Sequence, residues 1–300
     1  MRLALVVNRS AGTFRRLPVE PTIVDISEAL RSAGHTVEVM AVGRRDLAAA
    51  LSAVAQRADI DGVIAGGGDG TVLTAVLAGL GESKPLGLLP LGTLNLFARD
   101  LGLPADPVEA AWRLARAEVA EIDLAEVNGL PFAIWASLGM HPWTVRRRDH
   151  LQRKGTSRWQ AMALAALRAF RRYPMVTATL SVRGETLTVT TPLLVISNNA
   201  WREESLPLSR EALDKGELVV HVAMVRTRLG LLQLAFNALM GRWKTSRYLH
   251  TYVADEVRVT SKKRRLMLSL DGEVTVMRSP LVFRLRPKAL KVLMPMHEAP

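Results

Sequence analysis

Residues 66–72 read GGGDGTV, and this stretch decides the fold that the sequence predicts. It follows the short apolar run GVIA at 62–65, typical of a buried strand, and leads into TVLTAVLAGL, typical of a helix. A tight turn is the simpler interpretation, but three adjacent glycines cost backbone entropy that a turn does not require. Glycines also let amides approach an anion at a helix N-terminus. We therefore expect phosphate binding by the loop residues Gly66, Gly67, Gly68, Asp69, Gly70, Thr71 and Val72.

Asp69 lies in the middle of this loop, where a carboxylate would repel phosphate unless a divalent cation lay between them. This favours Mg²⁺ and a polyphosphate nucleotide. The loop lacks the Lys-Ser/Thr of a Walker A sequence, and Thr71 stands where a dinucleotide-binding G-x-G-x-x-G would have its last glycine.

The elements around the loop alternate. Apolar strands are predicted at 2–7, 36–42, 62–65 and 86–90, with helices at 21–33, 46–58, from 71, near 94–101 and at 107–117. This order predicts a Rossmann-like α/β domain with a parallel sheet. Beyond EIDLAEV, short alternating segments predict a β-rich antiparallel domain with helices at 158–172 and 229–241. The predicted domains are residues 1–122, with 288–300 returning to them, and residues 123–287.

Two later stretches carry further polar groups. PLGTLNLFARDLGLP (90–104) follows the fourth strand, and its Thr93 and Asn95 are either an ordinary helix start or a second wall of the phosphate site. SLDGEV (269–274) ends a strand. Asp-Gly is a strong hairpin signal, so a plain turn is one interpretation. Its carboxylates, Asp271 and Glu273, are also the groups that a kinase needs to take a proton and to hold metal.

Together these stretches resemble the diacylglycerol kinase catalytic family, which includes bacterial lipid kinases and sphingosine kinases. The resemblance covers nearly the whole chain: NRSAG at 8–12, GGGDGT, PLGTLNLFA, EIDLAEVNG near 121, the Asp-x-Gly-x-Leu of 214–218, and DGE. It implies ATP, Mg²⁺ and transfer of phosphate to a lipid hydroxyl such as that of diacylglycerol. It also implies that Asn8 belongs to the nucleotide site, that Glu273 is the general base beside Asp271, and that Asp69, Asp123 and Asp271 form an acidic metal network.

The chain departs from the family pattern at three places. Leu96 stands where many relatives have Asp, and Lys215 where many have a metal-binding Asp. The segment NNAWREESLPLS (198–209) replaces a glycine-rich stretch. These departures leave open a kinase that has lost activity and only senses nucleotide or phospholipid. A soluble NAD-type kinase shares the glycine loop but leaves the late Asp-Gly-Glu unexplained.

The amino-acid composition and net charge limit the classes of binding partner that we expect. The chain is 49% hydrophobic, 23% charged and has no cysteine, which indicates a globular protein without disulfides or thiolate metal sites. Its formal net charge of +12 favours anionic partners. With 5% aromatic residues, a membrane surface is favoured over nucleic acid. No apolar run approaches the ~20 residues of a membrane span. We expect a cytoplasmic protein bound peripherally to anionic membrane; a homodimer is left open. The helix at 158–172 has one apolar side, and two interpretations of it stay open: packing in the core or contact with the membrane.

Overall fold

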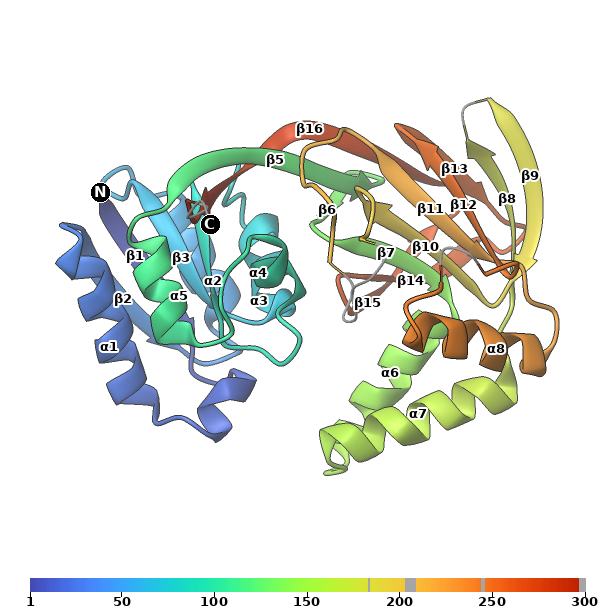
Figure 1. Cartoon of the computed structure of the whole chain (residues 1–300), viewed down its shortest axis with the longest axis horizontal. Coiled ribbons are helices and arrows are strands. Elements are labelled where there is room, and N and C mark those ends of the chain that lie inside the picture. Colours follow the sequence, from blue (N-terminus) through green and yellow to red (C-terminus); the bar gives the residue numbers. More distant parts are fainter. Residues whose placement is uncertain (183, 203–208, 244–245, 297–300) are drawn as a thin grey trace. The chain divides into compact units, whose positions relative to one another are not determined.

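The computed structural model describes residues 1–182, 184–202, 209–243 and 246–296 (Figure 1). The chain divides into two compact units: unit 1 is Met1–Leu124 with Arg286–Pro300, and unit 2 is Ala125–Leu285. The middle of the NNAWREESLPLS segment, residues 203–208, lies outside the described residues.

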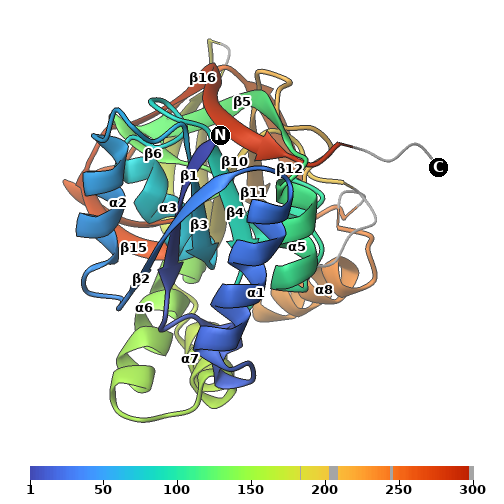
Figure 2. The ribbon, with the colours of Figure 1, turned by 90° about the vertical axis from the view of Figure 1, so that its left-hand side faces the viewer.

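Unit 1 contains a parallel sheet in the order β2-β1-β3-β4. Its elements are β1 (Arg2–Asn8), α1 (Val19–Ser32), β2 (Thr36–Val42), α2 (Leu47–Ala55), β3 (Gly62–Gly67), α3 (Asp69–Leu77), β4 (Leu86–Pro90), α4 (Leu96–Asp100) and α5 (Pro107–Leu114), with a 3₁₀ turn at Gly12–Arg15. Helices α1 and α5 lie side by side on one face of the sheet, and α2 and α3 lie on the other (Figure 2). Both faces are thus covered, which explains why β1, β3 and β4 read as unbroken apolar runs rather than as alternating ones.

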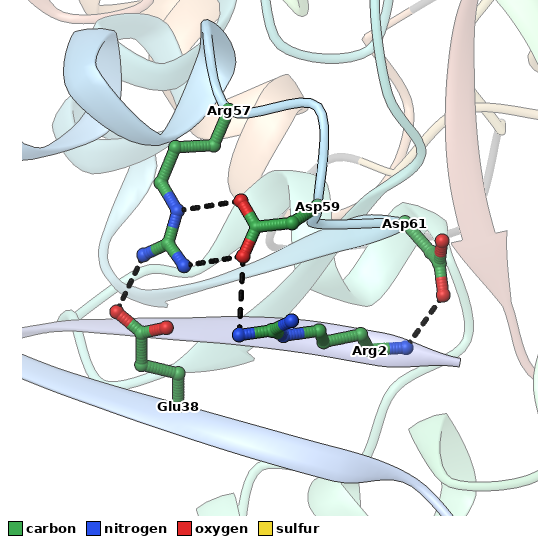
Figure 3. A network of polar contacts seen from close by, with 5 residues as sticks. All are labelled: Arg2, Glu38, Arg57, Asp59 and Asp61. Atoms are coloured by element: carbon green, nitrogen blue, oxygen red, sulfur yellow. Dashed lines mark hydrogen bonds and ion pairs between the residues drawn. The ribbon is translucent and has the colours of Figure 1, made fainter.

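A charged network ties two strands of unit 1 to the turn that leads into β3 (Figure 3). Arg57 donates two hydrogen bonds to the carboxylate of Asp59 (3.0 and 2.7 Å) and one to Glu38 on β2 (2.6 Å). Arg2 on β1 pairs with Asp59 at 3.1 Å, and its backbone amide donates to Asp61 at 2.6 Å. The hydrogen bonds from Arg57 lower the pKa of Asp59 to about 2.

Two strands carry the chain from one unit to the other: β5 (Glu118–Val127) and β16 (Leu281–Met294). In unit 1, Val292 of β16 is paired in parallel with Leu86 of β4. Leu290 packs so closely on Gly81 that a Cβ there would lie 2.2 Å from its Cδ1, and the amide of Lys291 donates to the Gly81 carbonyl at 2.7 Å. The part of β16 from Arg286 onward is therefore an integral part of unit 1.

In its described residues, unit 2 is built from antiparallel strands and three helices. One sheet has the order β12-β11-β10-β7-β14-β15, and the other contains β16-β13-β8-β9, with β5 and β6 joined to it. Its elements are β6 (Leu130–Phe132), β7 (Trp135–Gly139), α6 (Met140–Arg153), α7 (Arg158–Arg172), β8 (Val176–Val182), β9 (Glu185–Thr191), β10 (Leu193–Asn198), β11 (Leu218–Ala223), α8 (Arg228–Leu239), β12 (Leu249–Ala254), β13 (Glu256–Thr260), β14 (Arg265–Leu270) and β15 (Glu273–Arg278).

The predicted fold class is confirmed: a mostly parallel α/β sheet precedes an antiparallel β-rich part. Helix α6 was missed from the sequence. It contains Pro142 in its first turn and a run of three arginines, and it buries only Pro142 and Val145, so it has no apolar periodicity to reveal it. Among the described helices, none combines the length and the apolar character that crossing a bilayer requires.

Candidate functional site

Three loops of unit 1 meet at the carboxyl ends of neighbouring parallel strands. They follow β1, β3 and β4, and they are the three stretches of this unit that the sequence singles out. Thr13 of the first loop donates its amide to Leu91 O (3.0 Å), and the amides of Leu91 and Gly92 both donate to Gly67 O (3.0 and 3.1 Å). In parallel α/β sheets this edge is where ligands bind.

Glycines allow the loops to approach one another. A Cβ on Gly92 would lie 2.4 Å from the Cα of Gly68, and one on Gly67 would lie 2.1 Å from the hydroxyl oxygen of Thr71. Both distances are far below any real carbon contact, so a side chain at either position would force the backbone apart. Glycine is thus needed at these two positions partly because the loops pack closely on one another, which the sequence alone does not reveal.

The glycine loop also presents a helix N-terminus. Gly68 is the N-cap of α3, and its carbonyl accepts from the amides of Thr71 (2.7 Å) and Val72 (3.2 Å). Within the described part of the chain, no backbone carbonyl is recorded as an acceptor for the amides of Gly68 and Gly70. Two donors at the positive end of a helix are suited to an anion.

Two residues of the predicted loop contribute little to such a site. Val72 is buried, and its amide is already used by Gly68. Thr71 is also buried, with its side chain held against Gly67. Their place is in the packing beneath the loop. Gly66 and Gly67 are buried in β3 as well, which leaves residues 68–70 as the accessible part.

Asn8 and Asn95 shape the loops around the glycines. Asn8 accepts the Ser10 amide on its side-chain oxygen (3.0 Å) and the Ala11 amide on its carbonyl (2.9 Å), which forms the turn after β1. Asn95 takes a left-handed conformation (φ 49°), and its side-chain oxygen accepts from the Gly92 amide at 2.8 Å. Thr93, by contrast, is exposed, and a Cβ on Gly12 would lie 3.2 Å from its hydroxyl oxygen. Of these predicted residues, Thr93 is the exposed one.

Asp69 joins two of the loops. Its Oδ1 accepts from the amide of Phe97 at 3.2 Å, so the carboxylate caps helix α4 from a distant part of the chain. Burial raises the pKa of Asp69 above its ordinary value, and hydrogen bonds from the amides of Phe97 and Leu96 oppose that rise. Leu96, the position where many relatives carry Asp, is buried in the core of unit 1. Asp69 is therefore a structural brace at the edge of the candidate phosphate site, whatever else it binds.

The Asp-Gly pair of the third stretch is a two-residue hairpin turn between β14 and β15. Asp271 (φ 46°) and Gly272 (φ 87°) both have positive φ, and Leu270 is paired with Glu273 across the turn. This is the geometry that Asp-Gly favours.

Asp271 faces into unit 2. Its Oδ1 accepts from the amides of Ile134 and Trp135 (both 2.9 Å), and its Oδ2 accepts from Ala133 (2.7 Å). Burial raises the pKa of Asp271 to about 6, while the three amides and the charge of Arg210 act to lower it. Both carboxylate oxygens are committed to backbone donors, so the geometry assigns Asp271 to anchoring the hairpin.

Glu273 has different surroundings. It is the first residue of β15 and is exposed, and no described residue is recorded as a hydrogen-bond or ion-pair partner of its carboxylate. A carboxylate held at a rigid turn and open to solvent can accept a proton from a ligand.

The predicted acidic metal network is not assembled within either unit. Asp123 is buried in unit 1 and accepts from the amide of Lys288 at 3.0 Å. Asp69 lies at the glycine loop of the same unit, and Asp271 belongs to unit 2. Within the part of the chain that the structure describes, no group of three or more His, Asp or Glu side chains is placed to hold a metal ion.

Several residues near the Asp271 hairpin were not found from the sequence. Arg210 is buried and donates to Ala133 O at 2.8 Å and to Asn198 O at 3.3 Å. His141 shares a hydrogen bond with Ser137 (2.7 Å), and burial beside Arg148 lowers its pKa to about 4. No local pattern marks Arg210, because its partner Ala133 lies 77 residues away in the chain. The partner of His141 is only four residues away, but the contact depends on the turn from β7 into α6, a helix that the sequence does not predict.

Aromatic side chains cluster beside these polar groups. Trp201 stacks on His221 with ring centroids 4.8 Å apart, and Trp243 and Trp135 meet Trp201 edge-on at 5.8 and 5.5 Å.

Elsewhere in unit 2, a cavity of about 250 Å³ lies among β8, β9 and β12. Its lining is mostly apolar: Leu180, Val182, Glu185, Leu187, Tyr252 and Val253.

Comparison with known proteins finds two families that follow each other along the chain. The diacylglycerol kinase catalytic domain matches residues 2–127, and the YegS C-terminal NAD kinase beta sandwich-like domain matches residues 137–294. The second match alone spans more than half of the chain.

The individual relatives either have low sequence identity to the chain or match only part of it. An uncharacterized protein, sll0036, of Synechocystis sp. is 26% identical over 79% of the chain and 55% of its own length. A Cronobacter sakazakii protein described as "Probable lipid kinase YegS-like" is 39% identical over 41% of the chain and 44% of its own length. The matches thus span about half the length of these relatives. A solved structure of a diacylglycerol kinase from Bacillus anthracis superimposes with a TM-score of 0.73 at 18% identity, covering 98% of this chain and 96% of that one, which supports the fold.

Proposed function

Since the chain belongs to the diacylglycerol kinase catalytic-domain family, with a YegS-type C-terminal domain, we propose that it transfers the γ-phosphate of ATP to a lipid hydroxyl. Diacylglycerol is the acceptor we propose first. The observation that carries the proposal is the convergence of the loops after β1, β3 and β4 upon the N-terminus of α3.

The nucleotide phosphates bind at residues 68–70, where the amides of Gly68 and Gly70 donate to phosphate oxygens. The close contact between Gly68 and Gly92 fits this role, because a loop pinned at its back holds its amides in fixed directions. Thr93 adds a hydroxyl at the exposed side of the site. The ligand site is thus formed mostly from backbone, which suits a phosphate chain.

Mg²⁺ accompanies the nucleotide. Where Mg²⁺ is held mainly by phosphate oxygens and water, one or two protein carboxylates suffice, and Asp69 is the carboxylate at the loop. When bound, the ion neutralises the negative charge that develops on the transferred group. The commitment of Asp271 to three backbone amides leaves it to position the hairpin rather than to hold metal.

Glu273 is the general base. It takes the proton of the acceptor hydroxyl as that oxygen attacks the γ-phosphorus and the bond to the β-phosphate oxygen breaks, with ADP as the leaving group. Its rigidity comes from Asp271, which ties the hairpin to residues 133–135. The apolar cavity of unit 2 is suited to the hydrocarbon part of a lipid, and we propose it as a place for an acyl chain.

Labelled ATP tests the proposal. The purified protein is incubated with γ-labelled ATP, Mg²⁺ and separate acceptors: diacylglycerol, phosphatidylglycerol, a sphingoid base and NAD. Label in a lipid product supports the proposal, and label in diacylglycerol supports its finer form. Label transferred to NAD alone would replace it with a soluble NAD-type kinase, and ATP binding without any transfer would indicate a sensor.

A further inference from the structure

Helix α8 is apolar on its outer face as well as on its inner one. On the inner face, Leu234 is buried against Ala223 and Val225. The outer face is defined by five exposed side chains, which we call the α8 face: Leu229 (75% exposed), Leu232 (52%), Phe236 (60%), Leu239 (69%) and Met240 (56%). Their spacing of three, four and seven residues places them along one side of the helix.

This pattern is unusual for a helix that meets only water. A surface helix normally turns a polar side to solvent, and a helix that is apolar all round is covered. Isolated exposed apolar residues are common, but a contiguous row of large ones marks an interaction surface.

Helix α7 extends the surface. Its C-terminus meets the N-terminus of α8, where Arg228 donates to Arg171 O (2.6 Å) and the Tyr173 hydroxyl donates to Val225 O (3.0 Å) (Figure 1). On α7, Trp159 is 74% exposed, and Leu164 and Leu167 are also exposed.

The charge of the chain is concentrated in the same two segments. Residues 150–184 and 218–254, which contain α7 and α8, hold 12 Lys and Arg and no Asp or Glu. The rest of the chain has 28 Lys and Arg against its 28 Asp and Glu, so it is formally neutral. The whole net charge of +12 therefore comes from the segments around the α8 face.

We propose that the α8 face, extended by α7, inserts into the surface of an anionic lipid bilayer, with the surrounding arginines binding lipid phosphates. An apolar row bordered by basic residues is the arrangement of helices that lie in a membrane interface. A second copy of the chain fits less well, because a symmetric contact would bring two acid-free, basic surfaces together. The proposal goes beyond the kinase reaction, and binding is measured without nucleotide, so it stands or fails separately from the proposed function.

Vesicle flotation tests it. The full chain is mixed with vesicles of phosphatidylcholine alone or with phosphatidylglycerol added, at low and high salt. We expect binding to the anionic vesicles, weakened by salt because the Debye length shrinks from ~8 Å at physiological ionic strength to ~3 Å at 1 M. Equal binding to both vesicle types, or none to the anionic ones, overturns the proposal.

Matched variants separate the apolar and basic parts. Phe236→Ser should weaken binding by about tenfold or more, as expected for removing one large side chain from an apolar environment. Trp112→Ser, on the exposed surface of α5 in unit 1, should leave binding unchanged. Arg226→Glu should weaken binding more than Lys263→Glu, although both residues are exposed and both substitutions change the net charge equally. Equal effects within either pair overturn the assignment to α8.

A label reports insertion directly, because the chain has no cysteine of its own. A polarity-sensitive fluorophore on Leu232→Cys should shift to the blue with anionic vesicles, and one on Leu77→Cys, an exposed position of α3, should not. A blue shift that appears without vesicles and rises with protein concentration would overturn the proposal in favour of a contact between copies.

Discussion

Asp271 and Glu273 are separated by one glycine, and the structure gives them opposite surroundings. Asp271 is buried, with three backbone amides on its carboxylate, whereas Glu273 is exposed at the start of β15. A sequence motif presents both as acids of one site. The geometry instead makes one acid hold the turn and leaves the other available to a ligand.

Glu273→Gln should lower the rate of phosphate transfer by ~10²–10⁴-fold, because the amide cannot accept the proton. ATP affinity and the melting temperature should stay near those of the wild type. Rates with saturating ATP and lipid, together with a nucleotide-binding titration, measure both. Activity within a few-fold of wild type would remove Glu273 from the mechanism.

Asp271→Asn is the matched comparison. The amide nitrogen would face the Ala133 amide, so one acceptor is lost in a buried place, at a cost of roughly 1–3 kcal/mol in unfolding free energy. Urea unfolding should show this loss, which Glu273→Gln should not share. A fully stable Asp271→Asn would show that the three amide contacts contribute little.

Two substitutions of Asp69 separate the effect of its charge from its structural role as the acceptor for the Phe97 amide. Asp69→Asn keeps an oxygen for the Phe97 amide, so the fold should remain while the Mg²⁺ dependence of the rate shifts to higher concentration. Asp69→Ala should in addition lower the melting temperature. If the Mg²⁺ titrations of wild type and Asp69→Asn overlap, Asp69 has only its structural role and does not bind the metal ion.

Among the elements, the strands and helices of unit 1 were predicted well because each has a local signal. Asp106, for example, caps α5 with hydrogen bonds to the amides of Val108 and Glu109, and Pro107 follows it. Helix α6 and the position of Arg210 were not predictable. The first is held by packing against α7, β7 and β14 rather than by an apolar stripe, and the second depends on contacts with distant strands.

The network around Arg57 gives a pH prediction. The pKa of Asp59 is about 2, below its ordinary 3.8, so between these pH values the unfolded state binds more protons than the folded one. The stabilisation is therefore present above about pH 4 and is lost as pH falls towards 2. The carboxyl ¹³C shift of Asp59 should still report an ionised group at pH 3 in wild type, and should titrate near its ordinary value in Arg57→Gln. A wild-type midpoint near 4 would contradict the network in Figure 3.

The loop at 213–218 should need no metal. Lys215 is exposed, and backbone hydrogen bonds close the base of the segment, from Asn199 N to Glu217 O (2.9 Å) and from Glu211 N to Ala200 O (2.9 Å). Without nucleotide, Mg²⁺ should leave the melting temperature unchanged. Lys215→Asp restores the acid found in many relatives and tests whether a latent site exists. A clear Mg²⁺-induced rise in the wild type that persists in both Asp69→Asn and Asp271→Asn would contradict this prediction.

At the scale of the whole molecule, the division into units does not follow the order of the chain. Leu290 is buried in unit 1 although it lies beyond all of unit 2. Leu290→Ala should destabilise the protein by about 2–5 kcal/mol, with the largest loss of hydrogen-exchange protection in β4 and β3. Met296→Ala, at an exposed position, is the control and should change little. Loss of protection confined to unit 2 would contradict the placement of β16.

The return of β16 to unit 1 has a consequence during synthesis. A nascent chain normally completes its first domain before the second emerges from the ribosome. Here residues 1–124 wait for Leu290, Val292 and Leu293 to complete their core, while residues 125–285 have already been made. Unit 1, although translated first, is thus the last to be finished, and until then the edge of β4 and the surface of Gly81 that Leu290 covers are open to chaperones.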